Sequence, residues 1–173
     1  AATVYRKSLV ACFKPLKGWK DERNGGWVKE GGPPCRESMS VPCGQCVGCR
    51  IDHNNEWANR IVHEAHEWDQ NCFVTLTYDD ENVPYGLTLV PEHLQKFLKR
   101  LRKSRPGETI RFYACGEYGE ETNRPHYHLC LFNCQFPDRD LYSNNNGNPL
   151  YTSDTLEKLW GKGFATIEIG RAH

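Results

Sequence analysis

The segment Arg124-Pro125-His126-Tyr127-His128-Leu129-Cys130-Leu131-Phe132 has the composition and alternation of a β-strand. Alternate side chains of a strand share a face, so His126 and His128 point together while Tyr127 points away. Two imidazoles on one face are either a pair of metal ligands or half-exposed histidines that cover the surface of a sheet. The segment alone leaves both interpretations open.

Strand and helix signals around this segment follow a simple order. Pro91 to Ser104 predicts a helix with one apolar face, and Ser153 is expected to cap a shorter helix that ends at Trp160. Strands are predicted at 72–78, 109–117, 125–132 and 164–169, and residues 138–149 predict a polar loop. This order is that of an α+β, ferredoxin-like split βαβ fold with a central antiparallel sheet. Such a sheet carries its helices on one face and leaves the other free for a site.

The strand that precedes the histidine segment ends with a carboxylate. A short loop joins the two strands, so hairpin pairing can bring Glu117 opposite His126 or His128. Two imidazoles and a carboxylate leave coordination positions open and suit Mg²⁺ or Mn²⁺, with a phosphate oxygen completing the shell. Glu120 and Glu121 are alternative carboxylates, and any of these acids can instead solvate the turn.

Two features are candidates for binding phosphate groups. Thr75 and Thr77 share one face of their strand and could donate hydrogen bonds to phosphate oxygens, although threonine is also a good strand former. The helix at 91–104 carries a basic face that Arg111 continues, and this face is either a phosphate track or a solvated surface.

Composition limits the function classes. The chain has 173 residues, of which 25% are charged and 38% hydrophobic, as is typical of a soluble globular protein. Its formal net charge is zero, so nucleic-acid binding would depend on local clusters of Lys and Arg. No apolar run approaches a membrane span and no signal peptide is recognisable, so we expect a cytoplasmic protein that binds no membrane.

The spacing of three cysteines indicates a metal site. Cys43, Cys46 and Cys49 are separated by two residues each, and Gly44 and Gly48 allow the tight turns that let cysteines converge on one ion. We expect thiolates that hold a structural Zn²⁺ rather than disulfides, with Cys12 or Cys35 as the fourth ligand. The remaining four of the nine cysteines are expected to be buried core thiols, namely Cys72, Cys115, Cys130 and Cys134.

Two domains are therefore expected. Residues 1–50 form an irregular N-terminal arm with the cysteine knuckle, and residues 51–173 form the α+β domain. A helix is expected to begin after a cap at Asp52 or Asn54 and to run to about Asp69. A loose apolar stripe on that helix is formed by Ile51, Trp57, Ile61, Ala65 and Trp68.

Several motifs together resemble a known family. They are Pro-Cys-Gly-Gln-Cys-Val-Gly-Cys-Arg at 42–50, Asn-Cys-Phe-Val-Thr-Leu-Thr-Tyr-Asp-Asp at 71–80, Tyr-Ala-Cys-Gly-Glu-Tyr-Gly-Glu at 113–120 and Arg-Pro-His-Tyr-His at 124–128. These motifs resemble those of the replication initiator proteins of gokushovirus-type microviruses, which are HUH endonucleases. The resemblance implies rolling-circle replication, in which a tyrosine nicks single-stranded origin DNA with the help of a metal ion and stays joined to the 5′ phosphate. It also implies action in the cytoplasm of a bacterial host.

The resemblance assigns roles to particular residues. His126 and His128 look like the family's metal pair, Tyr127 like its bulky hydrophobic residue, and Glu117 like the acidic third ligand. The element around Cys12 resembles an N-terminal cysteine of these proteins, which favours Cys12 over Cys35 as the fourth zinc ligand. The residues expected to contact DNA are Thr75, Thr77, Tyr78, Arg100, Lys103 and Arg111.

One departure from the family pattern concerns the nucleophile. In the family the nucleophilic tyrosine lies on a helix after the last strand, where this chain ends at Gly170-Arg171-Ala172-His173. We therefore expect that this chain lacks the nucleophile and forms no covalent adduct with DNA. The alternative function is a non-catalytic, zinc-stapled module that binds single-stranded DNA on its sheet.

Overall fold

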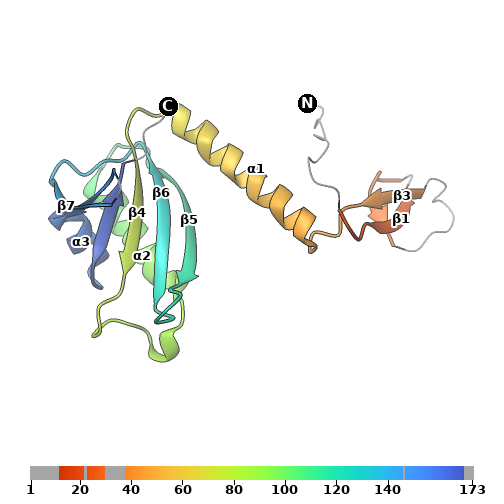
Figure 1. Cartoon of the computed structure of the whole chain (residues 1–173). Coiled ribbons are helices and arrows are strands. Elements are labelled where there is room, and N and C mark those ends of the chain that lie inside the picture. The colour runs from red at the N-terminus through yellow and green to blue at the C-terminus, as the bar shows by residue number, and fades with distance from the viewer. Residues whose placement is uncertain (1–11, 22, 30–37, 146, 170–173) are drawn as a thin grey trace. The chain divides into compact units, whose positions relative to one another are not determined.

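The computed structural model describes residues 12–21, 23–29, 38–145 and 147–169 (Figure 1). The chain divides into two compact units, residues 1–60 and residues 61–173. Among the described residues, no helix has both the length and the apolar character needed to cross a membrane.

The first unit contains a small antiparallel sheet in the order β2-β1-β3, with strands β1 (Leu16–Lys20), β2 (Trp27–Val28) and β3 (Ser38–Val41). Asp21 closes the turn between β1 and β2, because its backbone N–H donates to Gly26 O at 2.8 Å and its carbonyl accepts from Gly25 N at 2.7 Å. The expectation of an irregular arm was therefore wrong for this part. Short strands paired across a glycine turn were not apparent as a strand pattern in the sequence.

Helix α1 (Val47–His66) begins earlier than expected. It starts within the cysteine knuckle rather than at Asp52 or Asn54, and its buried residues are Gly48 and Cys49. Of the expected apolar stripe, Ile51 and Trp57 are exposed while Ile61, Ala65 and Trp68 are partly buried. At the other end, the Asn71 side-chain amide donates to Ala65 O and Trp68 O, both at 2.8 Å, and so satisfies carbonyl groups that the helix leaves without partners.

The second unit is built on a six-stranded antiparallel sheet in the order β5-β6-β4-β9-β8-β7 (Figure 1). The connection β4-α2-β5 leaves β6 between its two strands, which is the split βαβ arrangement expected from the order of elements. The elements are β4 (Asn71–Thr77), the short 3₁₀ helix η1 (Tyr85–Leu87), α2 (Pro91–Ser104), β5 (Arg111–Tyr118), β6 (Pro125–Phe132), β7 (Arg139–Asn145), β8 (Asn148–Ser153), α3 (Asp154–Trp160) and β9 (Ala165–Glu168).

The hairpin β7-β8 corrects the prediction of a polar loop at 138–149. Its strands pair from Arg139 with Ser153 to Asn145 with Asn148, with a register shift between Leu141 and Ser143. The connecting residues are Asn and Gly, the strongest short-range signal for a two-residue hairpin, and Gly147 has a φ of +86°. The polarity of the asparagine run had concealed this turn.

Strand alternation divides the sheet into two chemically distinct faces. On one face, Val74, Leu76 and Leu129 are 0% exposed and pack with the buried residues of α2 and α3, such as Phe97 and Trp160. Ser153 caps α3 as predicted, since its hydroxyl accepts from Leu156 N, and Gly161 ends the helix in the left-handed conformation. Both helices cover this face, so the residues between the core positions of β4 and β6 point to the other face.

Candidate functional site

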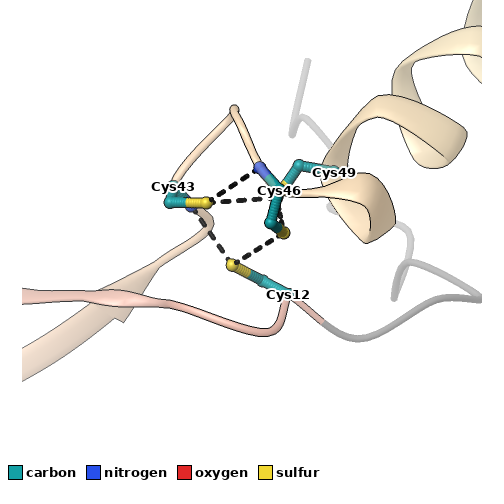
Figure 2. Close-up of side chains that lie close together, drawn as sticks. All are labelled: Cys12, Cys43, Cys46 and Cys49. Carbon is teal, nitrogen blue, oxygen red and sulfur yellow. Dashed lines mark hydrogen bonds between the residues drawn. The ribbon is translucent and has the colours of Figure 1, made fainter.

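Four cysteine sulfurs in the first unit converge (Figure 2). Cys12, Cys43, Cys46 and Cys49 have sulfur atoms that all lie within 4.8 Å of one another. Sulfur–sulfur distances are 3.5 Å for Cys46–Cys49, 3.8 Å for Cys46–Cys12 and 4.0 Å for Cys43–Cys49. A tetrahedral ion with metal–sulfur bonds of about 2.3 Å places its ligands about 3.8 Å apart, so the set has the dimensions of a thiolate metal site. Cys12 is thus the fourth member of the cluster, and Cys35 lies outside the described residues.

The local backbone positions these sulfurs. Gly44 has a φ of +74°, which turns the chain between Cys43 and the start of α1. Backbone N–H groups point at sulfur: Cys43 N donates to Cys12 Sγ at 3.3 Å, and Cys46 N donates to Cys43 Sγ at 3.4 Å. Because Cys46 precedes the first turn of α1 and Cys49 lies within it, both sulfurs face the same side of the helix start.

The same N–H groups tune the thiols. Hydrogen bonds from the backbone N–H groups of Cys49 and Phe13 lower the pKa of Cys46 to about 6. The N–H groups of Gln45 and Cys46 also lower the pKa of Cys43, whereas burial raises the pKa of Cys49 to about 12. The cluster therefore favours thiolate, the form that binds metal, at some of its positions and leaves no ligand position open to a substrate.

The histidine pair lies on the face of the second sheet opposite the helices. In the paired strands, Thr75 is opposite His128 and Thr77 is opposite His126, while Glu117 is opposite His126 on the other side. The sheet therefore brings the predicted hairpin residues and the threonines of β4 into one group.

Each imidazole is oriented by a threonine. Thr75 Oγ1 lies 3.0 Å from Nδ1 of His128, and Thr77 Oγ1 lies 3.0 Å from Nδ1 of His126. A ring whose Nδ1–H donates to a hydroxyl presents the Nε2 lone pair to a metal, which is the usual outer-shell arrangement of metal-binding histidines. Glu117 Oε2 lies 3.1 Å from His128 Nε2, close to the spacing of about 3 Å between adjacent ligands of an octahedral ion.

The surroundings of the pair favour neutral imidazole. Burial lowers the pKa of His126, and the neighbouring His128 lowers it further by charge repulsion. Phe73 stacks on His128 with ring centroids 5.6 Å apart. Phe73 shares a face with the two threonines by strand alternation, which is the signal that would have identified it from sequence.

The two clusters differ in how closely their ligand atoms gather. Within the described part of the chain, the four cysteines are the one group in which at least three ligand atoms lie within 4.8 Å of one another. The ring centroids of His126 and His128 are 6.5 Å apart, and Glu117 contacts the second ring. Glu120 and Glu121, the alternative carboxylates, are exposed in the turn after β5.

The structure separates the residues predicted to contact DNA. Thr75 and Thr77 lie at the site, but their hydroxyls are engaged by the histidines. Tyr78 lies on the helix side, 2% exposed, with its hydroxyl 2.9 Å from His93 Nδ1, and burial raises its pKa. Its position argues against the expected DNA contact.

The expected basic track also divides between the two faces. Arg100 donates to Leu159 O and Trp160 O, both at 2.7 Å, and so satisfies carbonyl groups at the end of α3. Lys103 belongs to the same helix, which covers the face opposite the histidines. Arg111 lies on the histidine face of β5, where it forms an ion pair with Glu64 at 2.7 Å. Cys115, expected in the core, is exposed on that same face.

Comparison with known proteins gives consistent results. Residues 71–172 match the family model of the replication-associated protein ORF2, which covers the sheet from β4 onward. The replication-associated protein ORF2 of Spiroplasma virus 4 is 43% identical over 182 residues, covering 91% of this chain and 56% of the relative. The replication-associated protein VP4 of Bdellovibrio phage phiMH2K is 35% identical over 140 residues, covering 77% of this chain and 44% of the relative.

A third relative, the replication-associated protein ORF4 of Chlamydia phage 1, is 27% identical over 139 residues, covering 76% of this chain and 35% of its own. The chain thus spans about half, or less, of the length of these curated relatives. No solved structure matches the chain.

Proposed function

Because the chain belongs to the family of the replication-associated protein ORF2, we propose that its second unit is the DNA-nicking domain of a phage replication initiator, with the fold and chemistry of an HUH endonuclease. The observation that carries the proposal is the pair His126 and His128, held on the open face by Thr75 and Thr77 beside Glu117. The substrate would be single-stranded viral origin DNA within the bacterial host.

The proposed metal site uses Nε2 of both histidines and the carboxylate of Glu117. A bound Mn²⁺ or Mg²⁺ would polarise the scissile phosphate and neutralise the charge that develops on its oxygens. The threonine hydroxyls fix the imidazole rings, and the lowered pKa of His126 keeps that ring neutral, which a metal ligand requires. The open sheet face leaves room for the phosphate.

Nicking exchanges one phosphoester bond for another. A tyrosine phenolate attacks phosphorus, the bond to the 3′ oxygen breaks, and that oxygen leaves as a hydroxyl while the 5′ phosphate remains on tyrosine. Tyr127 is 3% exposed and lies on the helix side, and the Tyr118 hydroxyl accepts from Leu89 N at 3.3 Å. The proposal therefore assigns the nucleophile to a residue outside the described part of the chain.

The cysteine cluster has a separate role in the proposal. Four thiolates around one closed position suit a structural Zn²⁺, which would fasten Cys12 to the start of α1 and supply folding energy rather than chemistry.

Metal binding tests the proposal directly. Titration of the zinc-loaded chain with Mn²⁺, followed by electron paramagnetic resonance, should show one site that His128→Ala weakens more than about 100-fold. Thr75→Val, which keeps the shape but removes the hydroxyl partner of His128, should weaken the site by about 10- to 100-fold. His63→Ala, at an exposed histidine of α1, is the matched control and should leave Mn²⁺ affinity unchanged.

Adduct formation tests the chemistry. With Mn²⁺ and an origin oligonucleotide, the 173-residue chain should give no covalent adduct, while a protein that continues past His173 should form one that His128→Ala abolishes. Mn²⁺ binding that is unaffected by His128→Ala would contradict the endonuclease and favour the alternative, a zinc-stapled module that binds single-stranded DNA without cleaving it.

A further inference from the structure

Two aromatic rings are exposed together on the second unit. Phe164 is 40% exposed and Tyr142 is 61% exposed, and their ring centroids lie 5.4 Å apart in an edge-to-face arrangement. Tyr142 lies at the register shift of the β7-β8 pairing, between Leu141 and Ser143. Such irregularities in a strand redirect a side chain, and here the redirected ring meets Phe164.

The strand register places this pair in line with the histidines. Ala165 is opposite Leu76 and Thr166 is opposite Thr75, and Thr77 N donates to Phe164 O at 2.8 Å. Phe164 is therefore beside Thr77, on the face that carries the histidines.

A continuous row results from this register. Thr77 contacts His126 at 3.0 Å, and His126 is opposite Glu117. The row runs across the strands from Glu117 through His126, Thr77 and Phe164 to Tyr142. Because neighbouring strands are about 4.8 Å apart, Phe164 is roughly 10 Å from the strand that carries the histidines.

We infer that Tyr142 and Phe164 form a stacking platform for bases of the single-stranded DNA whose phosphate would lie at the histidine pair. The inference rests on the proposed function, since it extends the same surface and substrate. The rings supply aromatic faces and edges rather than cations, which suits bases and not phosphates. The row is continuous with the proposed metal site, so one strand of DNA could occupy both.

Binding of a 12-nucleotide oligothymidine in EDTA, measured by fluorescence anisotropy at fixed salt, isolates the platform from the divalent metal. Tyr142→Ala should weaken binding by about 5- to 150-fold, the range expected for loss of one base–aromatic stack, whereas Tyr142→Phe should bind like the parent. Tyr85→Ala is the matched control, because Tyr85 is a fully exposed tyrosine on η1, away from the row. It should leave affinity unchanged.

An abasic oligonucleotide of the same length sharpens the test. Its affinity should be the same for the parent and for Tyr142→Ala, because the platform would have no base to stack on. Phe164→Ala should behave like Tyr142→Ala on both oligonucleotides once its melting temperature shows that it is folded, and Tyr142 carries the test if it is not.

Three results would overturn the inference. They are equal effects of Tyr142→Ala and Tyr85→Ala, a loss that persists with the abasic oligonucleotide, or a Tyr142→Ala variant that sediments as a smaller species than the parent, which would make the rings a contact between copies of the chain. His128→Ala should not alter the base-dependent loss. A failure of the metal site would therefore be seen separately from a failure of the platform.

Discussion

The cysteine cluster and the histidine hairpin are both sets of potential metal ligands, but they are built in opposite ways. Three of the four cysteines lie within residues 43–49, and the sulfurs converge at distances of 3.5–4.0 Å. The histidine site instead draws residues from β4, β5 and β6 and faces outward from the sheet. A closed set of thiolates suits an ion that holds a fold together, and an open set suits an ion that shares a substrate.

The surroundings of each cluster reinforce the contrast. The first unit has a small sheet of short strands, so a metal would contribute much of its stability. The second unit has a core of buried residues from six strands and two helices that does not depend on Glu117 or the histidines. Removing metal ligands should therefore unfold one unit and only disarm the other.

Cys46→Ala should produce the greatest change. Structural zinc sites contribute about 10–16 kcal/mol of apparent binding free energy, so losing a ligand should remove the metal and the structure that it supports. Hydrogen exchange should show lost protection in β1 and β3 with β4 and β6 unchanged, and elemental analysis should show loss of one zinc per chain.

Cys115→Ala is the control, since Cys115 is an exposed cysteine outside the cluster. It should leave zinc content and protection unchanged. Retention of zinc by Cys46→Ala would remove the structural role that we assign to the cluster.

Gly163→Ala should disturb the second unit and leave the first intact. Gly163 has a φ of +134°, and a Cβ there would lie 2.3 Å from Asp79 N and 2.7 Å from Thr77 O. Backbone atoms at the end of β4 would have to move, which we expect to destabilise the unit by about 3–4 kcal/mol. Because Thr77 contacts His126, the variant should also weaken Mn²⁺ binding.

Gly107→Ala separates the two causes in that prediction. Gly107 has a φ of +85° but no atom within 4 Å of a built Cβ, so only the conformational penalty of about 1–2 kcal/mol applies. Urea unfolding followed by hydrogen exchange in β4 should rank the two variants. Equal losses would show that the close approach at Gly163 is relieved at no extra cost.

Much of the second sheet could be predicted because its signals are local. The alternation of β4 and β6, Pro91 at the start of α2 and the Ser153 cap each lie within one element and were confirmed. Tyr78 also followed alternation, since it belongs with Val74 and Leu76 on the core side, and expecting it to contact DNA overlooked that signal. The β7-β8 hairpin was missed because its polar composition outweighed the Asn-Gly step at its turn.

Long-range partners set the limit of prediction at the candidate sites. The hairpin of β5 and β6 is short, so the neighbourhood of Glu117 and His126 followed from pairing alone. Cys12 lies 31 residues before Cys43, and no spacing rule selects it over Cys35. Arg100 reaches carbonyl groups 59 and 60 residues away, so its engagement with α3 could not be seen in the basic pattern of its helix.

Asp138→Asn should produce a small, pH-dependent effect confined to the second unit. The carboxylate accepts from Ser153 Oγ and Thr155 N, both at 2.8 Å, at the start of α3. Burial alone would raise the pKa of Asp138, but these hydrogen bonds outweigh it and hold the pKa below the usual range.

A carboxyl group whose pKa is lowered by folding stabilises the protein above its unfolded value of about 3.9, and that contribution is lost as the pH falls through the folded value. At pH 7 Asp138→Asn should therefore cost about 0.5 kcal/mol, and the difference in melting temperature from the parent should shrink toward pH 3. Asp154→Asn is the control, because that carboxylate is 88% exposed and lies 4.0 Å from Lys158, so its effect should be smaller at every pH. A difference for Asp138→Asn that does not change with pH would mean that the amide lowers stability by altering the hydrogen-bond geometry, since loss of the carboxylate charge requires the difference to vanish in acid.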